Sequence, residues 1–275
     1  MSRFTLSVIT ICLLMFISIC NHNSPSLLSK KIIDAHKSNS PIPLISSIKS
    51  NLSIDAAYKI QNEYVKRRLN NEQISGFKAG ITSVAGQKKF KISEAVSGVL
   101  FASGHAINKT QINSDSIHNM KIEAEIGFSI SQDIKSSIKD TIQLMFFIDS
   151  IMPVIELPDL YFENINDLKA IDIIASNIAS GKYIIAAKSS IESIDSHSLS
   201  LTLTRNERQL IIQNDILKGH KEMALWLINS SLENGYSIKK GHIIITGAQG
   251  EIINAEKGNY LANYNNLGYI EFEIK

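Results

Sequence analysis

The sequence predicts an α+β fold, in which a β-rich core follows a small helical N-terminal part. Residues 122–130 alternate apolar and polar side chains, which is the period of a half-buried strand. Several short apolar segments in the second half of the chain are bounded by turn residues and indicate further strands. In two other segments apolar residues recur three and four positions apart, as in an amphipathic helix. We therefore expect one domain at 51–275, with its helical part at 51–101 and its β-rich core at 102–275.

The first twenty residues have the composition of a signal peptide. A short positive start is followed by seventeen uncharged residues, Phe4 to Cys20. Ser18 and Cys20 are small enough for a signal peptidase, which would cleave before Asn21. We therefore expect residues 1–20 to be removed and the protein to be exported, either to a periplasm or as a secreted protein.

Two alternatives for this segment stay open. Its length is marginal for a spanning helix, so an uncleaved membrane anchor at residues 4–20 is the first alternative. Lipoprotein processing at Cys20 is the second, although Ile19 is a poor residue before a lipidated cysteine. Both cysteines, Cys12 and Cys20, fall in this segment. Cleavage after Cys20 would therefore exclude disulfides, thiolate catalysis and cysteine–zinc sites from the mature chain.

The N-terminal elements follow in order. Residues 21–50 carry Asn, Ser and three of the chain's five prolines, and we interpret them as a linker with one short helix at 30–36. The next helix runs to Leu69 and has Ser53 or Asp55 as its N-cap. After it we expect a strand and turn at 76–83, then a short helix and loop that lead to a strand at 99–102.

The remainder of the chain is predicted to be rich in strands. Residues Arg205 to Arg208 form a hairpin turn between two of them, and Trp226 lies on a helix where we expect it in the core. The predicted strands are 122–130, 183–187, 199–204, 209–213, 242–246 and 269–274, and the predicted helices are 165–179 and 221–232.

Length and charge limit the classes of function. A chain of 275 residues with 44% hydrophobic residues can bury one full core. Its 28 basic and 26 acidic residues give a formal net charge of +2, and the basic residues form no long cluster. We therefore expect no nucleic-acid partner.

Glu123 and Glu125 are the most informative residues of the chain. On a strand both carboxylates project from one face, about 7 Å apart, and repel each other unless a cation lies between them. Ligation by oxygen alone favours Mg²⁺ or Mn²⁺ over Zn²⁺. The alternative is a solvated strand face with two ordinary glutamates, so a third ligand is needed.

Two further residues are candidates for the same site. Glu156 lies in a mostly apolar stretch, where an ionised carboxylate is unfavourable without a partner, and is the candidate third ligand. Lys78 lies between Gly76 and Gly80, where the backbone can closely approach a ligand. The alternatives are a glutamate at a rim beside a turn and an ordinary surface lysine.

A set of short motifs accompanies these residues. They are Gly76-Phe-Lys-Ala-Gly-Ile-Thr-Ser83, Gly98-Val-Leu-Phe101, Glu123-Ala-Glu125, Met152-Pro-Val-Ile-Glu-Leu-Pro-Asp159, Asp172-Ile-Ile-Ala-Ser-Asn-Ile-Ala-Ser-Gly181, Thr204-Arg-Asn206, Gly219-His220, Ala224-Leu-Trp-Leu227 and Gly241-His-Ile-Ile-Ile-Thr-Gly-Ala248. In this order and at these spacings, over roughly residues 52–275, the set resembles the 2-keto-4-pentenoate hydratase family. That family is part of the fumarylacetoacetate hydrolase superfamily and includes related 2-oxo-acid hydratases and 4-oxalocrotonate decarboxylases.

The resemblance implies a fold, a site and a substrate class. The fold would be a fumarylacetoacetate-hydrolase-like mixed β-sheet roll packed by helices. Glu123, Glu125 and Glu156 would bind Mg²⁺ or Mn²⁺, and Lys78 would take part in proton transfer, with its pKa lowered by the dication. The substrate would be a small 2-oxo acid from the catabolism of aromatic compounds, and we expect a homo-oligomer.

The activity implied is that of a hydratase, a lyase that adds water to a 2-hydroxydienoic or 2-oxo-enoic acid such as 2-oxopent-4-enoate. A 4-oxalocrotonate-type decarboxylase and an exported keto-acid-binding pseudoenzyme are the alternatives. A C–C bond hydrolase would need a His/Glu dyad near the metal, and none is evident in the sequence. The family is typically cytoplasmic, so export would be a departure from its usual catabolic role.

The chain also departs from the family pattern at several positions. Where the family has two acidic residues, this chain has Val96 and Ser103. It has Tyr161 where the family often has an arginine, and Ser176 where the family has an aspartate. Such a pattern is compatible with an altered substrate, a reduced activity or a binding role.

Overall fold

The computed structural model describes residues 23–116, 118–193 and 199–275. The chain forms two compact units, one of residues up to Arg67 with Phe162–Ser176 and one of Arg68–Tyr161 with Asn177–Lys275. The segment expected to direct export, residues 1–20, lies outside the described residues. Within those described ranges, no helix is both long and apolar enough to cross a membrane.

The first unit is helical and begins earlier in the chain than predicted. Helix α2 (Pro25–Lys37) follows the N-cap Ser24, whose hydroxyl accepts a hydrogen bond from the backbone N–H of Leu27. Leu28 and Ile32 are fully buried on one face of α2. The interpretation of 21–50 as a linker is therefore corrected. The other helices of this unit are α3 (Ile45–Ile48), α4 (Ile54–Arg68), the 3₁₀ turn η3 (Ile165–Asp167) and α7 (Ala170–Ala175).

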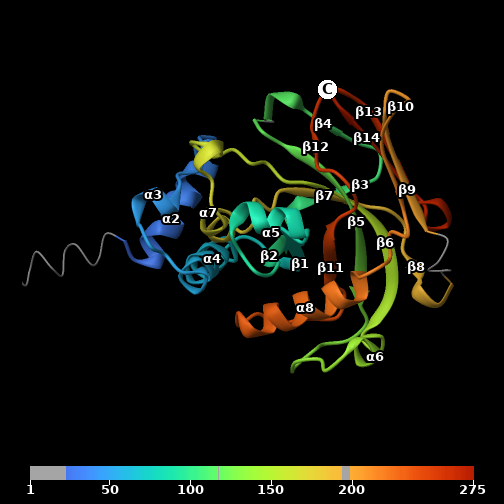
Figure 1. Cartoon of the computed structure of the whole chain (residues 1–275), viewed down its shortest axis with the longest axis horizontal. Coiled ribbons are helices and arrows are strands. Elements are labelled where there is room, and N and C mark those ends of the chain that lie inside the picture. The colour runs from blue at the N-terminus through green and yellow to red at the C-terminus, as the bar shows by residue number, and fades with distance from the viewer. Residues whose placement is uncertain (1–22, 117, 194–198) are drawn as a thin grey trace, which may run out of the picture. The chain divides into compact units, whose positions relative to one another are not determined.

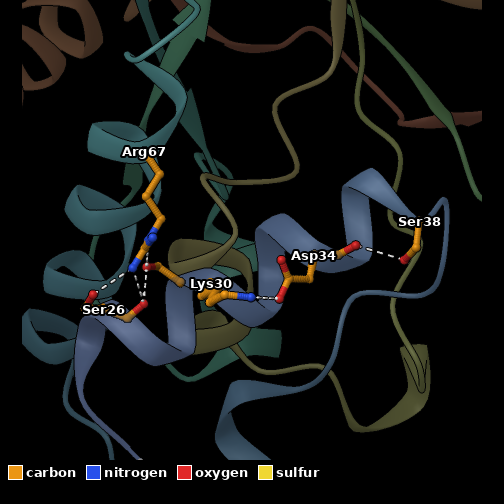
Figure 2. A network of polar contacts seen from close by, with 6 residues as sticks. Ser26, Lys30, Asp34, Ser38 and Arg67 are labelled. Atoms are coloured by element: carbon orange, nitrogen blue, oxygen red, sulfur yellow. Dashed lines mark hydrogen bonds and ion pairs between the residues drawn. The ribbon is translucent and has the colours of Figure 1, made fainter.

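Polar contacts join α2 to α4 within this unit (Figure 2). The guanidinium of Arg67 donates to the carbonyl and hydroxyl oxygens of Ser26 at 3.0 and 2.7 Å. Lys30 and Asp34 form an exposed ion pair along α2 at 2.5 Å, and the hydroxyl of Ser38 donates to the Asp34 carbonyl at 2.8 Å. The Arg67 contacts connect the two helices, whereas the exposed pair adds little because water screens it.

A buried carboxylate joins the other two helices of the unit. Asp172, at the start of α7, accepts hydrogen bonds from the backbone N–H and the hydroxyl of Ser46 at 2.7 and 2.8 Å. It also accepts from the backbone N–H of Lys169 at 3.0 Å, as an N-terminal capping residue does. Asp172, the first residue of the motif at 172–181, therefore has a structural role in this unit.

The second unit contains two β-sheets. The larger has nine strands in the order β2-β1-β11-β5-β6-β7-β3, with β12 beside β5 and β8 beside β6. Its strands are β1 (Ile74–Gly80), β2 (Val96–Phe101), β3 (His105–Ile107), β5 (Lys121–Ile130), β6 (Ile148–Leu157), β7 (Lys182–Ile185), β8 (Ser189–Ser190), β11 (Ile243–Ala248) and β12 (Ile253–Asn254). The pairs β1–β11 and β3–β7 are parallel and the others antiparallel, so the sheet is mixed, as predicted.

The smaller sheet has five strands in the order β10-β9-β13-β14-β4. Its strands are β4 (Thr110–Ile112), β9 (Ser200–Arg205), β10 (Arg208–Asn214), β13 (Gly258–Asn263) and β14 (Tyr269–Ile274). The hairpin between β9 and β10 was predicted at residues 205–208. Asn206 and Glu207 there have φ of +48° and +67°, as a two-residue hairpin turn requires.

Helix α8 (His220–Glu233) packs on strands β11, β1 and β2 of the large sheet, and Figure 1 shows it in orange beside them. A buried apolar cluster of Leu100, Met152, Val154, Tyr183, Ile243 and Ile245 lies in the large sheet. The other helical segments of this unit are α5 (Val84–Phe90), α6 (Thr141–Leu144), η1 (Ala102–Gly104), η2 (Ser114–Ser116), η4 (Ile191–Ser193) and η5 (Asn265–Leu267).

Most predicted elements are confirmed, but one predicted helix is shorter than expected and two long strands were not predicted. The helix expected at 165–179 is reduced to α7, because Asn177, Ile178 and Ala179 all have positive φ and end it. Strand β6 was not among the predicted strands, because both its faces are buried and its apolar run lacks alternation. Strand β13 was missed as well.

Candidate metal centre

Three glutamates meet because β5 and β6 pair in an antiparallel register that sets Glu123 opposite Glu156. Glu125 lies two residues further along β5, so its side chain points to the same face as that of Glu123. One carboxylate oxygen from each of the three residues lies within 4.8 Å of the others. The structure thus brings together all three residues that the sequence proposed as ligands.

These carboxylates have few hydrogen-bond donors. Glu125 and Glu156 are fully buried, and Glu123 is half-buried. Glu125 Oε2 accepts from the backbone N–H of Gly247 at 2.7 Å. Within the described part of the chain, Glu125 Oε1 and Glu156 Oε2 have no hydrogen-bond partner, whereas Glu156 Oε1 contacts the ammonium of Lys78. Such orphaned oxygens are unfavourable unless a cation satisfies them.

The glutamates perturb one another's ionisation. Burial, followed by the charges of Glu156 and Glu123, raises the pKa of Glu125 well above its usual value. Burial raises the pKa of Glu156 to about 7, although the Lys78 charge opposes this shift. Both shifts have the sign expected of carboxylates that are buried close together.

Lys78 reaches the same cluster from β1. Its side chain is buried, its Nζ forms an ion pair with Glu156, and it donates to the carbonyl of Ile178 at 3.3 Å. Burial favours a lower pKa for Lys78, but the charges of Glu156, Glu123 and Glu125 outweigh it and raise the pKa above its usual value. The lowering expected beside a bound dication stays a prediction.

A left-handed turn supplies the carbonyl that Lys78 contacts. Asn177, Ile178 and Ala179 have φ of +60°, +47° and +49°, an unfavourable conformation for the β-branched Ile178. The side chain of Asn177 holds the turn, since it accepts from the backbone N–H of Val99 at 2.7 Å and donates to the Val99 carbonyl at 2.8 Å. Gly98 leaves the necessary room, because a Cβ there would lie 2.3 Å from Ile178 Cγ1.

The positions that depart from the family pattern have local contacts of their own. Val96 is buried in β2, and Ser103 donates to Glu72 at 2.8 Å. The ring of Tyr161 stacks on His118 with centroids 3.8 Å apart. In the first unit, the Ser176 hydroxyl donates to the carbonyl of Ile173 at 3.0 Å. Each replacement is thus accommodated locally.

The residues present fit a hard divalent cation. Three ionised glutamates and one ammonium sum to a charge of −2, which one dication neutralises. All the ligand atoms are carboxylate oxygens, the donor type that Mg²⁺ and Mn²⁺ prefer. Glu125 Oε1 and Glu156 Oε2, which have no donor in the described residues, are the oxygens free to coordinate it.

Sequence reasoning did not assign roles to Asn177, His220 and Thr246, which lie around this site. His220 is buried at the start of α8, and its Nδ1 lies 2.6 Å from the hydroxyl of Thr246. All three belong to motifs that carried the family resemblance. The motifs were therefore the available signal, but the roles depend on contacts between distant parts of the chain.

No family model matches the chain. A 2-keto-4-pentenoate hydratase of Paraburkholderia xenovorans (strain LB400) is 24% identical over 252 residues, covering 90% of this chain and 93% of the relative. A 2-oxo-hept-4-ene-1,7-dioate hydratase of Escherichia coli is 24% identical over 255 residues, covering 89% of this chain and 96% of the relative. The chain thus aligns with nearly the whole length of both hydratases.

Solved structures show the same fold. The 4-oxalocrotonate decarboxylase from Pseudomonas putida G7, complexed with magnesium and adipate, superposes with a TM-score of 0.84 at 22% identity, covering 91% of this chain and 97% of that one. A fumarylpyruvate hydrolase from Pseudomonas aeruginosa, in complex with Mn²⁺ and pyruvate, has a TM-score of 0.54 at 10% identity, covering 72% of this chain and 88% of that one. The sequence relatives and the shared α+β fold confirm that the chain resembles the 2-keto-4-pentenoate hydratase family of the fumarylacetoacetate hydrolase superfamily.

Proposed function

We propose that the chain is a divalent-metal-dependent hydratase that adds water to a small 2-hydroxydienoic or 2-oxo-enoic acid. The observation that carries the proposal is the cluster of Glu123, Glu125 and Glu156, with buried oxygens that have no donor in the described residues. Relatives that align over about nine-tenths of the chain are hydratases of 2-oxo-enoic acids by name, which supports this substrate class.

The three glutamates would hold Mg²⁺ or Mn²⁺, the kind of ion bound in the structures with the same fold. When bound, the ion supplies a Lewis acid for the C2 oxygen and a carboxylate oxygen of a 2-oxo acid. The backbone N–H of Gly247 orients Glu125 for this role, and the half-buried Glu123 is the ligand nearest to solvent.

Lys78 is the group that would move a proton. Its Nζ is held between the Glu156 carboxylate and the Ile178 carbonyl, and it carries a proton in the resting protein because the carboxylates raise its pKa. As an ammonium it can donate a proton to C5 of a dienol while the C2 hydroxyl releases its proton to solvent, and water then adds at C4 of the resulting ketone. Its burial keeps competing water away from this proton.

The test is an ultraviolet assay of 2-hydroxypenta-2,4-dienoate with purified protein. We expect loss of the dienol absorbance with Mg²⁺ or Mn²⁺ and no loss in a chelator. Ketonisation should be easier to detect than net hydration, because Val96 and Ser103 replace two acids of the family and a missing base lowers a rate about 10²–10⁴-fold. A protein that is equally active in a chelator, or inactive with every divalent ion, would contradict the proposal.

A decarboxylase is the second candidate, and the superposition at a TM-score of 0.84 on a 4-oxalocrotonate decarboxylase favours it. A dication held by the same three carboxylates would stabilise the electron pair that stays on the substrate when CO₂ leaves. Release of CO₂ from 4-oxalocrotonate, without hydration of the pentadienoate, would select this alternative. Metal binding without turnover of either compound would indicate the pseudoenzyme.

A further inference from the structure

Strand β11 bulges where it passes Glu125. The register between β11 and β5 shifts between Ile245 and Ala248, and Gly247 within the bulge has a φ of +101°. A Cβ at this glycine would lie 2.5 Å from Thr82 Oγ1, so the backbone approaches Thr82 as only glycine allows. The bulge directs the N–H of Gly247 at Glu125 Oε2.

Two further bonds attach this bulge to β5 on either side of Glu125. The hydroxyl of Thr246 donates to the carbonyl of Ile126 at 3.0 Å. The backbone N–H of Gln249 donates to the carbonyl of Ala124 at 2.7 Å. The position of Glu125 therefore depends on how segment 246–249 is held.

His220 contacts both ends of that segment from the first residue of α8. Its Nδ1 lies 2.6 Å from Thr246 Oγ1, and its Nε2 contacts the side-chain amide of Gln249. Because the single hydroxyl proton of Thr246 goes to the Ile126 carbonyl, the hydroxyl accepts from an Nδ1–H of His220. Nε2 then carries the lone pair that accepts from the Gln249 amide.

The surroundings keep this imidazole neutral. Burial lowers the pKa of His220 to about 4, although the charge of Glu222 opposes the shift. A neutral ring with its proton on Nδ1 is therefore the form present at neutral pH, as the hydrogen bonds require.

We propose that His220 is a positioning residue for the metal centre, which joins α8 to Thr246 and Gln249 and thereby holds the Gly247 N–H on Glu125. The inference rests on the proposed function, since it takes Glu125 as a metal ligand. The side-chain hydrogen bonds of His220 go to Thr246 and Gln249, so it acts on Glu125 through the bulge.

The first test compares Mn²⁺ binding to substrate-free protein by electron paramagnetic resonance titration. His220→Phe keeps a ring and removes both hydrogen bonds, and we expect about 10–100-fold weaker binding, as for other groups that orient a ligand. The matched control is His242→Phe, since His242 is also buried but its ring accepts a hydrogen bond from the backbone N–H of Lys239 and not from segment 246–249. The control should bind Mn²⁺ as the native protein does.

A second variant covers the case in which His220→Phe does not fold. Thr246→Val removes the hydroxyl that His220 contacts, with little change in shape, and should weaken Mn²⁺ binding in the same range. If both variants fold, the double variant should bind no more weakly than the weaker single one, because they break the same chain of hydrogen bonds. Native affinity in a folded His220→Phe or Thr246→Val variant would overturn the proposal.

Nitrogen-15 NMR of the metal-free protein gives a readout independent of metal. We expect His220 as the neutral Nδ1–H tautomer at pH 7, and an Nε2–H tautomer or an imidazolium would overturn the inference. Native protein that binds no divalent ion would overturn the proposed function, and this inference with it. A variant at His220 that binds Mn²⁺ normally would overturn only the role of His220.

Discussion

Lys78 and the three glutamates form a buried group of charges that do not balance. Burial disfavours every ionised member, and the carboxylates outnumber the ammonium by three to one. Burial is the main cause of the raised pKa of Glu125 and of Glu156, and repulsion from neighbouring carboxylates adds to it. A dication would balance these charges, whereas the single charge of Lys78 does not.

The role of Lys78 can be separated from metal binding. Lys78→Ala should lower turnover about 10²–10⁴-fold, because the group that moves the proton is lost. Mn²⁺ binding should persist, because all three glutamates remain. The assay is dienol ketonisation beside a Mn²⁺ titration. Lys188→Ala is the control, since Lys188 bonds to Ser129 and is outside the proposed site. An active Lys78→Ala variant would show that another group moves the proton.

At the scale of elements, the strands present the glutamates and the irregular segments orient them. The register of β5 and β6 alone sets Glu123 opposite Glu156. The turn at 177–179 and the bulge at 246–249 then place a carbonyl beside Lys78 and an N–H on Glu125. The left-handed conformation of Ile178 is unfavourable, so surrounding contacts must hold the turn, whereas Gly247 allows the positive φ of the bulge.

Asn177 provides a test of the turn, with Asn229 as its matched control. Each side chain forms hydrogen bonds with both the backbone N–H and the carbonyl of one residue. That residue is Val99 for Asn177 and Ile138 for Asn229. Alanine at either position should lower the free energy of unfolding by about 1–3 kcal/mol, measured with urea. Only Asn177→Ala should also reduce turnover. Without the bonds to Val99 the turn is no longer held, so the Ile178 carbonyl loses its fixed position beside Lys78. Equal turnover in both variants would show that the turn at 177–179 does not contribute to the activity of the site.

Buried His220 should make stability depend on pH. In the unfolded chain its pKa is near 6.5, and burial lowers the pKa to about 4 in the folded protein. The unfolded state therefore binds more protons below pH 6.5, and stability should fall as the pH drops from about 6.5 to about 4. Chemical denaturation at each pH measures this fall. His220→Phe should flatten it more than His242→Phe, and an unchanged slope would contradict the burial argument.

At the scale of the whole molecule, the sequence predicted the fold and the cluster of three glutamates better than the contacts that hold the cluster. The alternation around Glu123 and Glu125 identified β5 directly, and Glu156 was found although the apolar run of β6 concealed a strand. The length of α7 was overestimated, because the residues around Ile178 give no sign that it adopts a left-handed conformation. The role of His220 was not predicted, because its partners Thr246 and Gln249 are brought to it by the bulge in β11, which the sequence does not show.

Export also concerns the whole chain, and we propose it on the sequence of residues 1–20 alone. N-terminal sequencing of protein from its native host should give a mature start near Asn21, because signal peptidase needs the small residues Ser18 and Cys20. Soluble protein that retains Met1 would contradict export, and full-length protein in the membrane fraction would support the anchor. The homo-oligomer likewise stays a prediction, which a measurement of the molecular mass of the purified protein in solution would test.

The most direct test of the account is the thermal stability of the substrate-free protein with and without Mn²⁺. Native protein should unfold at a higher temperature with Mn²⁺, because an ion at 100 times its Kd adds about 2.7 kcal/mol to stability. Glu125→Gln should lose this shift, whereas Glu273→Gln, a strand glutamate of the smaller sheet, should keep it. A native protein that Mn²⁺ does not stabilise, or a Glu125→Gln variant that it stabilises equally, would contradict the metal centre.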